Sequence, residues 1–516
     1  MQFLGWATLL LAFSAPAYAT QDESSKDQTI EELQRKIEAL EARLGKLESP
    51  PQESGDPKAA AGLEARLDET IRQNRTEGVR EPMRLNMTAP RDLAVEIDGQ
   101  LRVIGNYWGG YNSFNGNEDD SLSFGESVDL GFNFKVSENT RAYVSLHDGR
   151  IWGDTPAPGL NEAVIEDGTE NFYLNEAYVE TKDFMSSGVD LSFGRMKLEY
   201  GAERQLGDDE WLLNRTSFNG FVFTNDMGGG QMADVGLIRL GDGDTFVDSE
   251  IFPGGAIPGA DTTQAEMYYV YYTNKSEDLG TLDGYVFYVD GDAFSNTGAG
   301  QPIPNGERLD TRYFTYGARW AHNAGMIYWD AEFATQFGKF LGVRTDDYGF
   351  ETYALYARAG LDLEDVEFVD KVYVGYDQAT GDGNADNEQD QYIQLFPSLH
   401  GWFGIMDFAS WSNVTQYLLG ASFTVDENSS VDVSYRFIEL ENDMAPFGGY
   451  NFGVGGGTDN GHQVGQEADV VYSVKCGESS HADAGVGVFL PDEVYKAATG
   501  DNDEVWFAYL QYVLRF

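Results

Sequence analysis

Cysteine, histidine and positive charge are scarce in this chain, and each shortage excludes a class of protein. The one cysteine, Cys476, cannot form a disulfide within the chain or a site with several thiolates, and none of the 5 histidines lies four residues from another. Only 34 Lys and Arg residues face 86 Asp and Glu residues, which gives a formal net charge of -52. Because a polyanion of this size repels phosphate backbones, we expect no nucleic-acid partner.

Long apolar segments are also missing. After the N-terminus, no stretch approaches the roughly 20 apolar residues that a transmembrane helix needs, and hydrophobic residues make up an ordinary 41% of the chain. Aromatic residues nevertheless reach 14%, and glycine contributes 60 residues. This composition excludes a bundle of transmembrane helices and simple disorder, and it favours a folded, acidic chain.

The N-terminus has the pattern of a signal peptide. An apolar core at residues 3–13 precedes Pro16 and then Ala17-Tyr18-Ala19, the small-x-small pattern that signal peptidase cuts. We predict a signal peptide at residues 1–19 and export across an inner membrane. No Lys or Arg precedes the apolar core, so a buried first strand or helix is the alternative. No cysteine follows the cleavage site, which excludes an ordinary bacterial lipoprotein.

Residues 20–90 are predicted to form a periplasmic segment with an α-helical coiled coil and a linker. Six apolar residues are spaced alternately by three and four positions, the spacing of a coiled-coil seam: Ile30, Leu33, Ile37, Leu40, Leu44 and Leu47. Basic residues fall at the g positions and acidic residues at the e positions five residues later, which favours a parallel homo-oligomer through residues 28–48. The alternative is a single amphipathic helix that lies on its own protein.

After residue 90 the period of the apolar residues changes from 3.5 to 2. In segments such as 128–135 and 327–334, apolar residues alternate with polar or small ones. About 18 or 19 segments of this kind recur between turns rich in Gly, Asn, Asp and Ser, and an even number favours 18. We therefore predict an all-β fold for residues 91–516, a transmembrane antiparallel β-barrel. A water-soluble sandwich would also alternate, but it rarely repeats the pattern this often.

The last strand gives the sharpest membrane signal. Six residues share one face of it: Trp506, Ala508, Leu510, Tyr512, Leu514 and Phe516. The chain stops at Phe516, as outer-membrane barrels do when the insertion machinery reads their last strand. We therefore expect the outer membrane of a Gram-negative-type bacterium, contact with its lipid and lipopolysaccharide, and recognition of Phe516 by the barrel insertion machinery.

Alternate residues of a barrel strand point to opposite faces, and the polar set faces the lumen. The charged residues that point inward can therefore be predicted strand by strand. The basic candidates are Arg141, Arg319, Arg358 and Arg436. The acidic candidates are Asp129, Glu176, Asp190, Asp283, Asp330, Glu332, Asp432, Asp469 and Asp483. Such side chains either pair across the lumen or form an unbalanced ring that selects a solute.

One segment, residues 191–220, combines a glycine–arginine strand, a basic loop with a tryptophan, and an arginine before a serine–phenylalanine pair. Its marked residues are Gly194, Arg195, Lys197, Arg204, Trp211, Arg215, Ser217 and Phe218. Similar stretches follow at 376–382, 396–407, 465–469 and 485–491. In this order they resemble the alginate-export family of outer-membrane proteins, over about residues 95–516.

The resemblance implies an 18-stranded monomeric barrel through which an anionic polysaccharide diffuses, guided by Arg and Lys side chains at a constriction. Carried over to this chain, these are Arg195, Lys197, Arg204 and Arg215. Guanidinium groups can replace the counterions around uronate carboxylates. The same charges are also compatible with pairing to nearby acids: Glu199, Glu203, Asp208, Asp209 and Glu210. Asn219 stands where the family has Asp, and most of the negative charge lies in the barrel region.

Another acidic loop could hold calcium. Oxygen-bearing residues alternate with others from Asp382 through Asn384 and Asp386 to Glu388, so their oxygens could converge on a hard cation. The loop lacks the Gly and Glu that a helix–loop–helix calcium site needs, so a solvated loop is the alternative. No other cofactor is expected.

The leading hypothesis is an outer-membrane channel that passively conducts an anionic, alginate-like saccharide or another organic anion. A general, cation-preferring porin is the first alternative. A structural barrel tethered to the cell wall by its coiled coil is the second. We expect no enzyme, because no Ser-His-Asp set or pair of catalytic acids can be assigned to neighbouring strands.

Overall fold

The computed structural model describes residues 94–111, 120–153, 172–213, 215–241, 260–295, 308–339, 350–363, 368–382, 390–449, 451–454, 461–500 and 502–516. The chain divides into two units, Met1–Thr88 and Ala89–Phe516. The predicted signal peptide and coiled coil lie outside the described residues, so the fold below is that of the second unit. Asn384, Asp386 and Glu388 of the predicted calcium loop also lie outside them.

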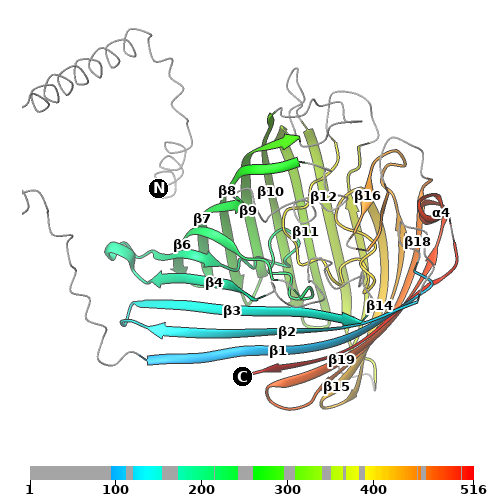
Figure 1. The fold of residues 1–516 in the computed structure, drawn as a ribbon, viewed down its shortest axis with the longest axis horizontal. Helices are drawn as coiled ribbons and strands as arrows, with labels where there is room; N and C mark the ends of the chain where they lie inside the picture. The colour runs from blue at the N-terminus through cyan, green and yellow to red at the C-terminus, as the bar shows by residue number, and fades with distance from the viewer. Residues whose placement is uncertain are drawn as a thin grey trace, which may run out of the picture. The chain divides into compact units, whose positions relative to one another are not determined.

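Eighteen strands form one antiparallel sheet in which each strand pairs with the next along the chain. The strand β1 also pairs with β20, so the sheet closes into a barrel (Figure 1). The strands are β1 (Ala94–Gly109), β2 (Ser121–Lys135), β3 (Thr140–Gly153), β4 (Phe172–Thr181), β5 (Asp190–Met196), β6 (Phe218–Gly228), β7 (Gln231–Gly241), β8 (Ala260–Ser276), β9 (Gly280–Ser295), β10 (Arg308–Ala324), β11 (Ile327–Lys339), β12 (Phe350–Asp362), β13 (Lys371–Ala379), β14 (Val414–Asp426), β15 (Ser429–Glu439), β18 (Gln463–Lys475), β19 (Ser480–Pro491) and β20 (Val505–Arg515). The predicted barrel of about 18 strands is confirmed.

Three small elements lie between these strands in the part of the chain that the structure describes. They are η1 (Phe184–Ser186), the hairpin of β16 (Phe447–Gly448) and β17 (Gly453–Val454), and α4 (Glu493–Thr499). Among the described residues, no helix is both long enough and apolar enough to cross a membrane.

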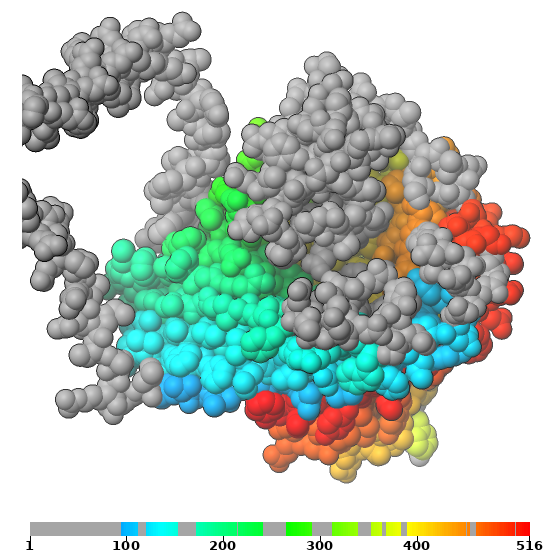
Figure 2. Space-filling view, viewed as in Figure 1, coloured from blue at the N-terminus to red at the C-terminus, as the bar shows by residue number. Residues whose placement is uncertain are grey.

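Alternate residues of each strand face opposite sides of the wall, as the two-residue period predicts. In β20 the outward Leu510 is 64% exposed, whereas the inward Phe507 is 1% exposed. The seam closes at the last residue, because the Phe516 N–H donates to the Gly99 carbonyl at 3.0 Å and the Gly99 N–H donates back at 2.9 Å. Figure 2 shows the blue first strand lying directly against the red C-terminal strands.

Rows of outward aromatic rings mark the edges of the apolar band. Tyr288 of β9 lies 4.5 Å from Phe314 of β10, and Phe314 lies 5.0 Å from Phe337 of β11, measured between ring centroids. Trp320 and Trp329 are 4.9 Å apart toward the opposite end of the same strands. Aromatic rows at two levels are the girdles expected where a barrel meets the two membrane interfaces.

The two ends of the barrel differ in the length of their connections. Short turns, such as 136–139, 229–230 and 427–428, lie at the end where β1 begins and β20 ends. We call this the short-turn end. The long connections lie at the other end, and two of them, β5 to β6 and β13 to β14, are rich in buried residues.

These two connections fold into the barrel and contact its inner wall. We call their described residues, 197–213, 215–217, 380–382 and 390–413, the plug. The two halves pair with each other, because the Phe396 N–H donates to the Gln205 carbonyl and the Gly207 N–H donates to the Phe396 carbonyl, both at 2.8 Å. Figure 1 shows their traces inside the curved wall. The core of the molecule therefore lies between the plug and the inner face of the barrel.

Candidate functional site

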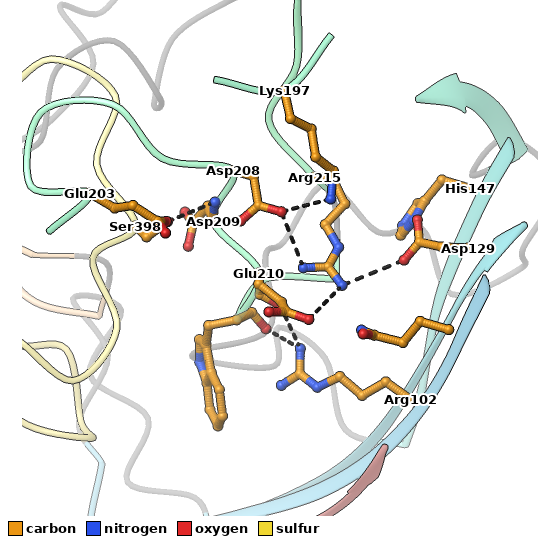
Figure 3. Close-up of polar contacts among 12 residues, drawn as sticks. Arg102, Asp129, His147, Lys197, Glu203, Asp208, Asp209, Glu210, Arg215 and Ser398 are labelled. Atoms are coloured by element: carbon orange, nitrogen blue, oxygen red, sulfur yellow. Dashed lines mark hydrogen bonds and ion pairs between the residues drawn. The ribbon is translucent and has the colours of Figure 1, made fainter. Parts of the chain in front are cut away.

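Arg215 is at the centre of the contact between the plug and the first strands of the wall (Figure 3). Its side chain is 2% exposed, and its Nη2 lies 3.5 Å from Asp129 of β2 and 3.5 Å from Glu210. Its Nη1 lies 3.9 Å from Asp208, which also accepts a 2.7 Å hydrogen bond from Lys197 Nζ. Two of the predicted constriction cations are thus matched by three carboxylates, which supports the alternative of pairing with nearby acids.

Further contacts fix this half of the plug to the wall. His147 of β3 bonds Asp129 through Nδ1 at 2.7 Å and the Leu213 carbonyl through Nε2 at 2.5 Å. Because a carbonyl oxygen only accepts, the Nε2 nitrogen carries a proton. The Arg102 guanidinium donates to the Glu210 carbonyl at 3.1 Å and lies 4.8 Å over the Trp211 ring.

The other half of the plug is held by different strands. Gln336 of β11 donates to the Ile393 carbonyl at 2.6 Å and accepts from the Ile393 N–H at 2.9 Å. Gln416 of β14 donates to the Trp402 carbonyl at 3.2 Å. The plug is therefore bonded to both sides of the wall.

Arg204 links both halves of the plug to the wall. Its side chain is fully buried, and its Nη1 lies 2.7 Å from Asp377 of β13. Its guanidinium lies 3.9 Å over Tyr356 of β12 and 4.3 Å over Trp402. A guanidinium that is paired and covered in this way is closed to a passing solute, and its loss would leave Asp377 buried without an ion pair.

The four basic residues predicted from strand parity do lie on the lumen face, and three of them pair with carboxylates. Arg319 donates to Asp330 at 2.7 Å and to Asp283 at 3.1 Å. Arg141 donates to Glu180 at 2.7 Å, and Arg436 donates to Asp469. The fourth, Arg358, donates to the Trp402 carbonyl at 3.4 Å and lies 5.0 Å over its ring.

Arg195 does not lie with the other predicted constriction residues. In the pairing of β5 with β6, Arg195 lies opposite Asn219, and Phe193 lies opposite Phe221. Both phenylalanine rings are exposed on the outer face of the wall. Arg195 is two residues from Phe193, so it points to the same outer face. Its Nε donates to the Asn175 carbonyl at 3.1 Å. The placement of Arg195 in the lumen is therefore wrong. The sequence already indicated this outward position, because Arg195 continues the alternate-residue series of the apolar Leu191 and Phe193.

A cavity of about 370 Å³ lies beside Arg215, toward the short-turn end. It is lined by Asp98, Gly99, Gln100, Asp129, Tyr143, Ser145, Asn175, Glu176, Lys197, Glu199, Asp208, Glu210, Arg215, Arg515 and Phe516. Six of these side chains are carboxylates and three are cations. Burial and the neighbouring charge of Asp208 raise the pKa of Glu199 to about 7. Sequence reasoning missed the cavity, because its residues come from five strands and the plug.

Metal binding has no support in the described part of the chain. No group of three or more His, Cys, Asp or Glu side chains there could hold a metal ion. Of the predicted calcium ligands, Asp382 alone is described. Calcium binding by this loop stays a prediction.

Comparison with known proteins gives one family and many similar folds. The sequence profile of a family described as alginate export matches residues 115–508. Pseudomonas aeruginosa OccK8 (OprE) aligns with a TM-score of 0.53 at 11% identity, covering 82% of this chain and 98% of that chain. The outer membrane protein opdK of the same organism gives 0.51 at 11% identity, covering 82% and 99%. Acinetobacter baumannii OccAB4 gives 0.51 at 13% identity, covering 83% and 100%. These likenesses are of fold, and no curated protein sequence matches.

Proposed function

Since this chain belongs to the alginate export family and is a passive channel of the outer membrane, not an enzyme, we propose that it conducts a saccharide that is uncharged or positively charged. The saccharide class is supported by the family match, which covers most of the barrel. The charge preference is supported by one observation, the pairing of most lumen cations with carboxylates of the protein itself.

This pairing supports a lumen that attracts cations more than anions. A uronate that entered would have to displace a tethered carboxylate from Lys197, Arg215 or Arg319, each of which already has an acidic partner within 4 Å. Carboxylates also outnumber cations around the cavity, and rings of Asp and Glu favour cations in channels. A polyanion is therefore repelled where a neutral or cationic solute is admitted.

A second candidate is the anionic saccharide that the family description suggests. Lys197, Arg215 and Arg515 do line the cavity, so a substrate carboxylate could exchange places with Asp208 or Glu210. This exchange gains little, because one carboxylate replaces another while the displaced acid remains close by.

Permeation of three sugars of similar size separates the two candidates. Liposomes that contain the folded full-length protein are placed in glucose, glucosamine or glucuronate, and their swelling rates are measured. We expect glucosamine and glucose to enter faster than glucuronate. Replacing the lumen acid in Glu176→Gln reduces the advantage of glucosamine, whereas Glu427→Gln in an exposed short turn leaves it unchanged. A fastest rate for glucuronate contradicts the proposal and favours the anionic candidate.

A further inference from the structure

The cavity beside Arg215 is lined by residues with buried polar atoms that have no hydrogen-bond partner. Asn175 is 1% exposed and Ser145 is 3% exposed, and both line the cavity. Within the described part of the chain, Asn175 Oδ1, Ser145 Oγ and Arg215 Nε have no hydrogen-bond partner. Gln100 Nε2 and Arg215 Nη1 at the same cavity also lack a hydrogen-bond partner among the described residues. Buried polar groups are normally satisfied, and a ligand in this cavity that both donates and accepts hydrogen bonds would satisfy them.

A β-bulge places Asn175 at this cavity. Ser145 pairs with Glu176, but the next residue, Leu146, pairs with Leu174, so Asn175 is an extra residue in β4. A bulge of this kind re-aims a side chain, and bulges are over-represented next to functional sites. The amide of Asn175 thereby joins the lumen-facing Glu176 along the same wall.

The charge around the cavity is unbalanced in one direction. Lys197, Arg215 and Arg515 each have an acidic partner, at 2.7 Å from Asp208, 3.5 Å from Asp129 and 3.1 Å from Glu210, respectively. In the described residues, three other lining carboxylates form no ion pair: Asp98, Glu176 and Glu199. Asp98 accepts a 2.8 Å hydrogen bond from Tyr143, and Glu176 accepts one from the Lys197 N–H at 3.3 Å. The lining residues therefore carry a negative formal charge, which a cationic ligand would reduce.

We propose that this cavity is a binding subsite for one amino-sugar unit, a pyranose that carries a free ammonium group. This assignment rests on the proposed function for the saccharide class. Sugar hydroxyls donate to Asn175 Oδ1 and exchange hydrogen bonds with Ser145 Oγ. The ammonium group donates to the lining carboxylates that form no ion pair, chiefly Glu176 and Glu199.

Three features favour an amino sugar over a simple cation. The Asn175 and Ser145 groups that lack hydrogen bonds are neutral, so they match the hydroxyl groups of a sugar. A metal ion or an alkylammonium has no hydroxyl groups. Tyr143 lines the same cavity, and an aromatic residue at a sugar site can pack against the apolar face of a pyranose. The volume of about 370 Å³ also falls within the range of roughly 300–1,000 Å³ that is usual for small-molecule sites.

Calorimetric titration of the detergent-solubilised full-length protein tests this subsite, with glucosamine, glucose and glucuronate as the probes. We expect glucosamine to bind most tightly and glucuronate most weakly. Asn175→Ala and Ser145→Ala each remove a hydrogen-bonding group. We expect each variant to bind glucosamine and glucose more weakly to the same extent, by about tenfold for each lost hydrogen bond. Glu176→Gln lowers the affinity for glucosamine but not the affinity for glucose. The matched control Asn225→Ala, at an exposed position of β6, binds like the parent.

The outcomes separate the subsite from the function. If Asn175→Ala, Ser145→Ala and Glu176→Gln fold and bind all three sugars like the parent, the subsite is wrong, even when the swelling rates still favour glucosamine. If the swelling rates favour glucuronate, the proposed function is wrong and the subsite fails with it. Ser145→Ala removes a single oxygen, so it keeps the test decisive should Asn175→Ala disturb the bulge.

Discussion

At the scale of single residues, Arg204 tests whether the plug is held by buried charge. Arg204→Ala leaves Asp377 buried without its ion pair, and we expect it to lower the free energy of unfolding by about 3–5 kcal/mol. The double variant Arg204→Met with Asp377→Leu removes both charges and recovers most of this loss. Urea unfolding in detergent measures the effect.

The control for Arg204 is a pair on the outer wall. Arg239 lies 3.1 Å from Glu266, and both side chains are over one-third exposed. Arg239→Ala should therefore cost less than about 1 kcal/mol. Equal losses for Arg204→Ala and Arg239→Ala would contradict the structural role of Arg204.

Glu199 makes the charge of the cavity depend on pH. Burial and the charge of Asp208 raise its pKa to about 7, so the carboxyl is neutral below this value and ionised above it. Glu203 adds to this rise and Lys197 opposes it. We expect the preference for cations to be greater at about pH 8 than at about pH 6, measured from bilayer currents. Glu199→Gln should remove most of the difference, and an unchanged difference would contradict the assignment.

Strand parity predicted the positions of most lumen charges but not their partners. Arg319 and Arg436 face inward as their alternation indicates, yet the carboxylates that neutralise them come from neighbouring strands, and the sequence does not give the register between strands. Arg195 was misplaced because the motif was followed in preference to parity. Asn175 was missed because a bulge shifts the alternation by one residue.

At the scale of elements, the half of the plug between β13 and β14 should restrict the current. Ala379 and Val414 already pair with each other, so residues 380–413 can be replaced by an Asn-Gly turn that continues this register. We expect the barrel to fold and its single-channel conductance to rise severalfold, because an 18-stranded barrel without a plug has a wide aqueous lumen.

The matched control changes a connection that does not enter the lumen. Replacing Glu427-Asn428, the short turn between β14 and β15, with Asn-Gly should leave the conductance unchanged. A folded loop variant with the parent conductance would contradict a plug that restricts the channel.

The strands could be predicted and the plug could not, for one physical reason. A strand in a membrane barrel alternates apolar and polar residues because one face meets lipid and the other meets the lumen. Residues 197–217 and 390–413 have no such period, since their burial depends on contacts with distant strands. The pairing of Gln205 with Phe396, which joins the two halves, follows from no local pattern.

At the scale of the whole molecule, the formal charge of -52 is matched by an excess of carboxylates around one cavity inside the barrel. Loop acids beyond the Debye length of about 10 Å are screened at 0.1 M salt. The carboxylates around the cavity lie inside the barrel beside Arg215, where screening is weaker. Part of the excess of acid in the sequence therefore lies inside the barrel.

The reversal potential of the parent channel in a planar bilayer under a KCl gradient is the most direct test of a carboxylate-dominated lumen. We predict a sign that reports potassium crossing faster than chloride, and a smaller potential in Glu176→Gln with Glu199→Gln. A sign that reports chloride crossing faster would contradict the account, because it would mean that the paired arginines, and not the surplus carboxylates, set the selectivity.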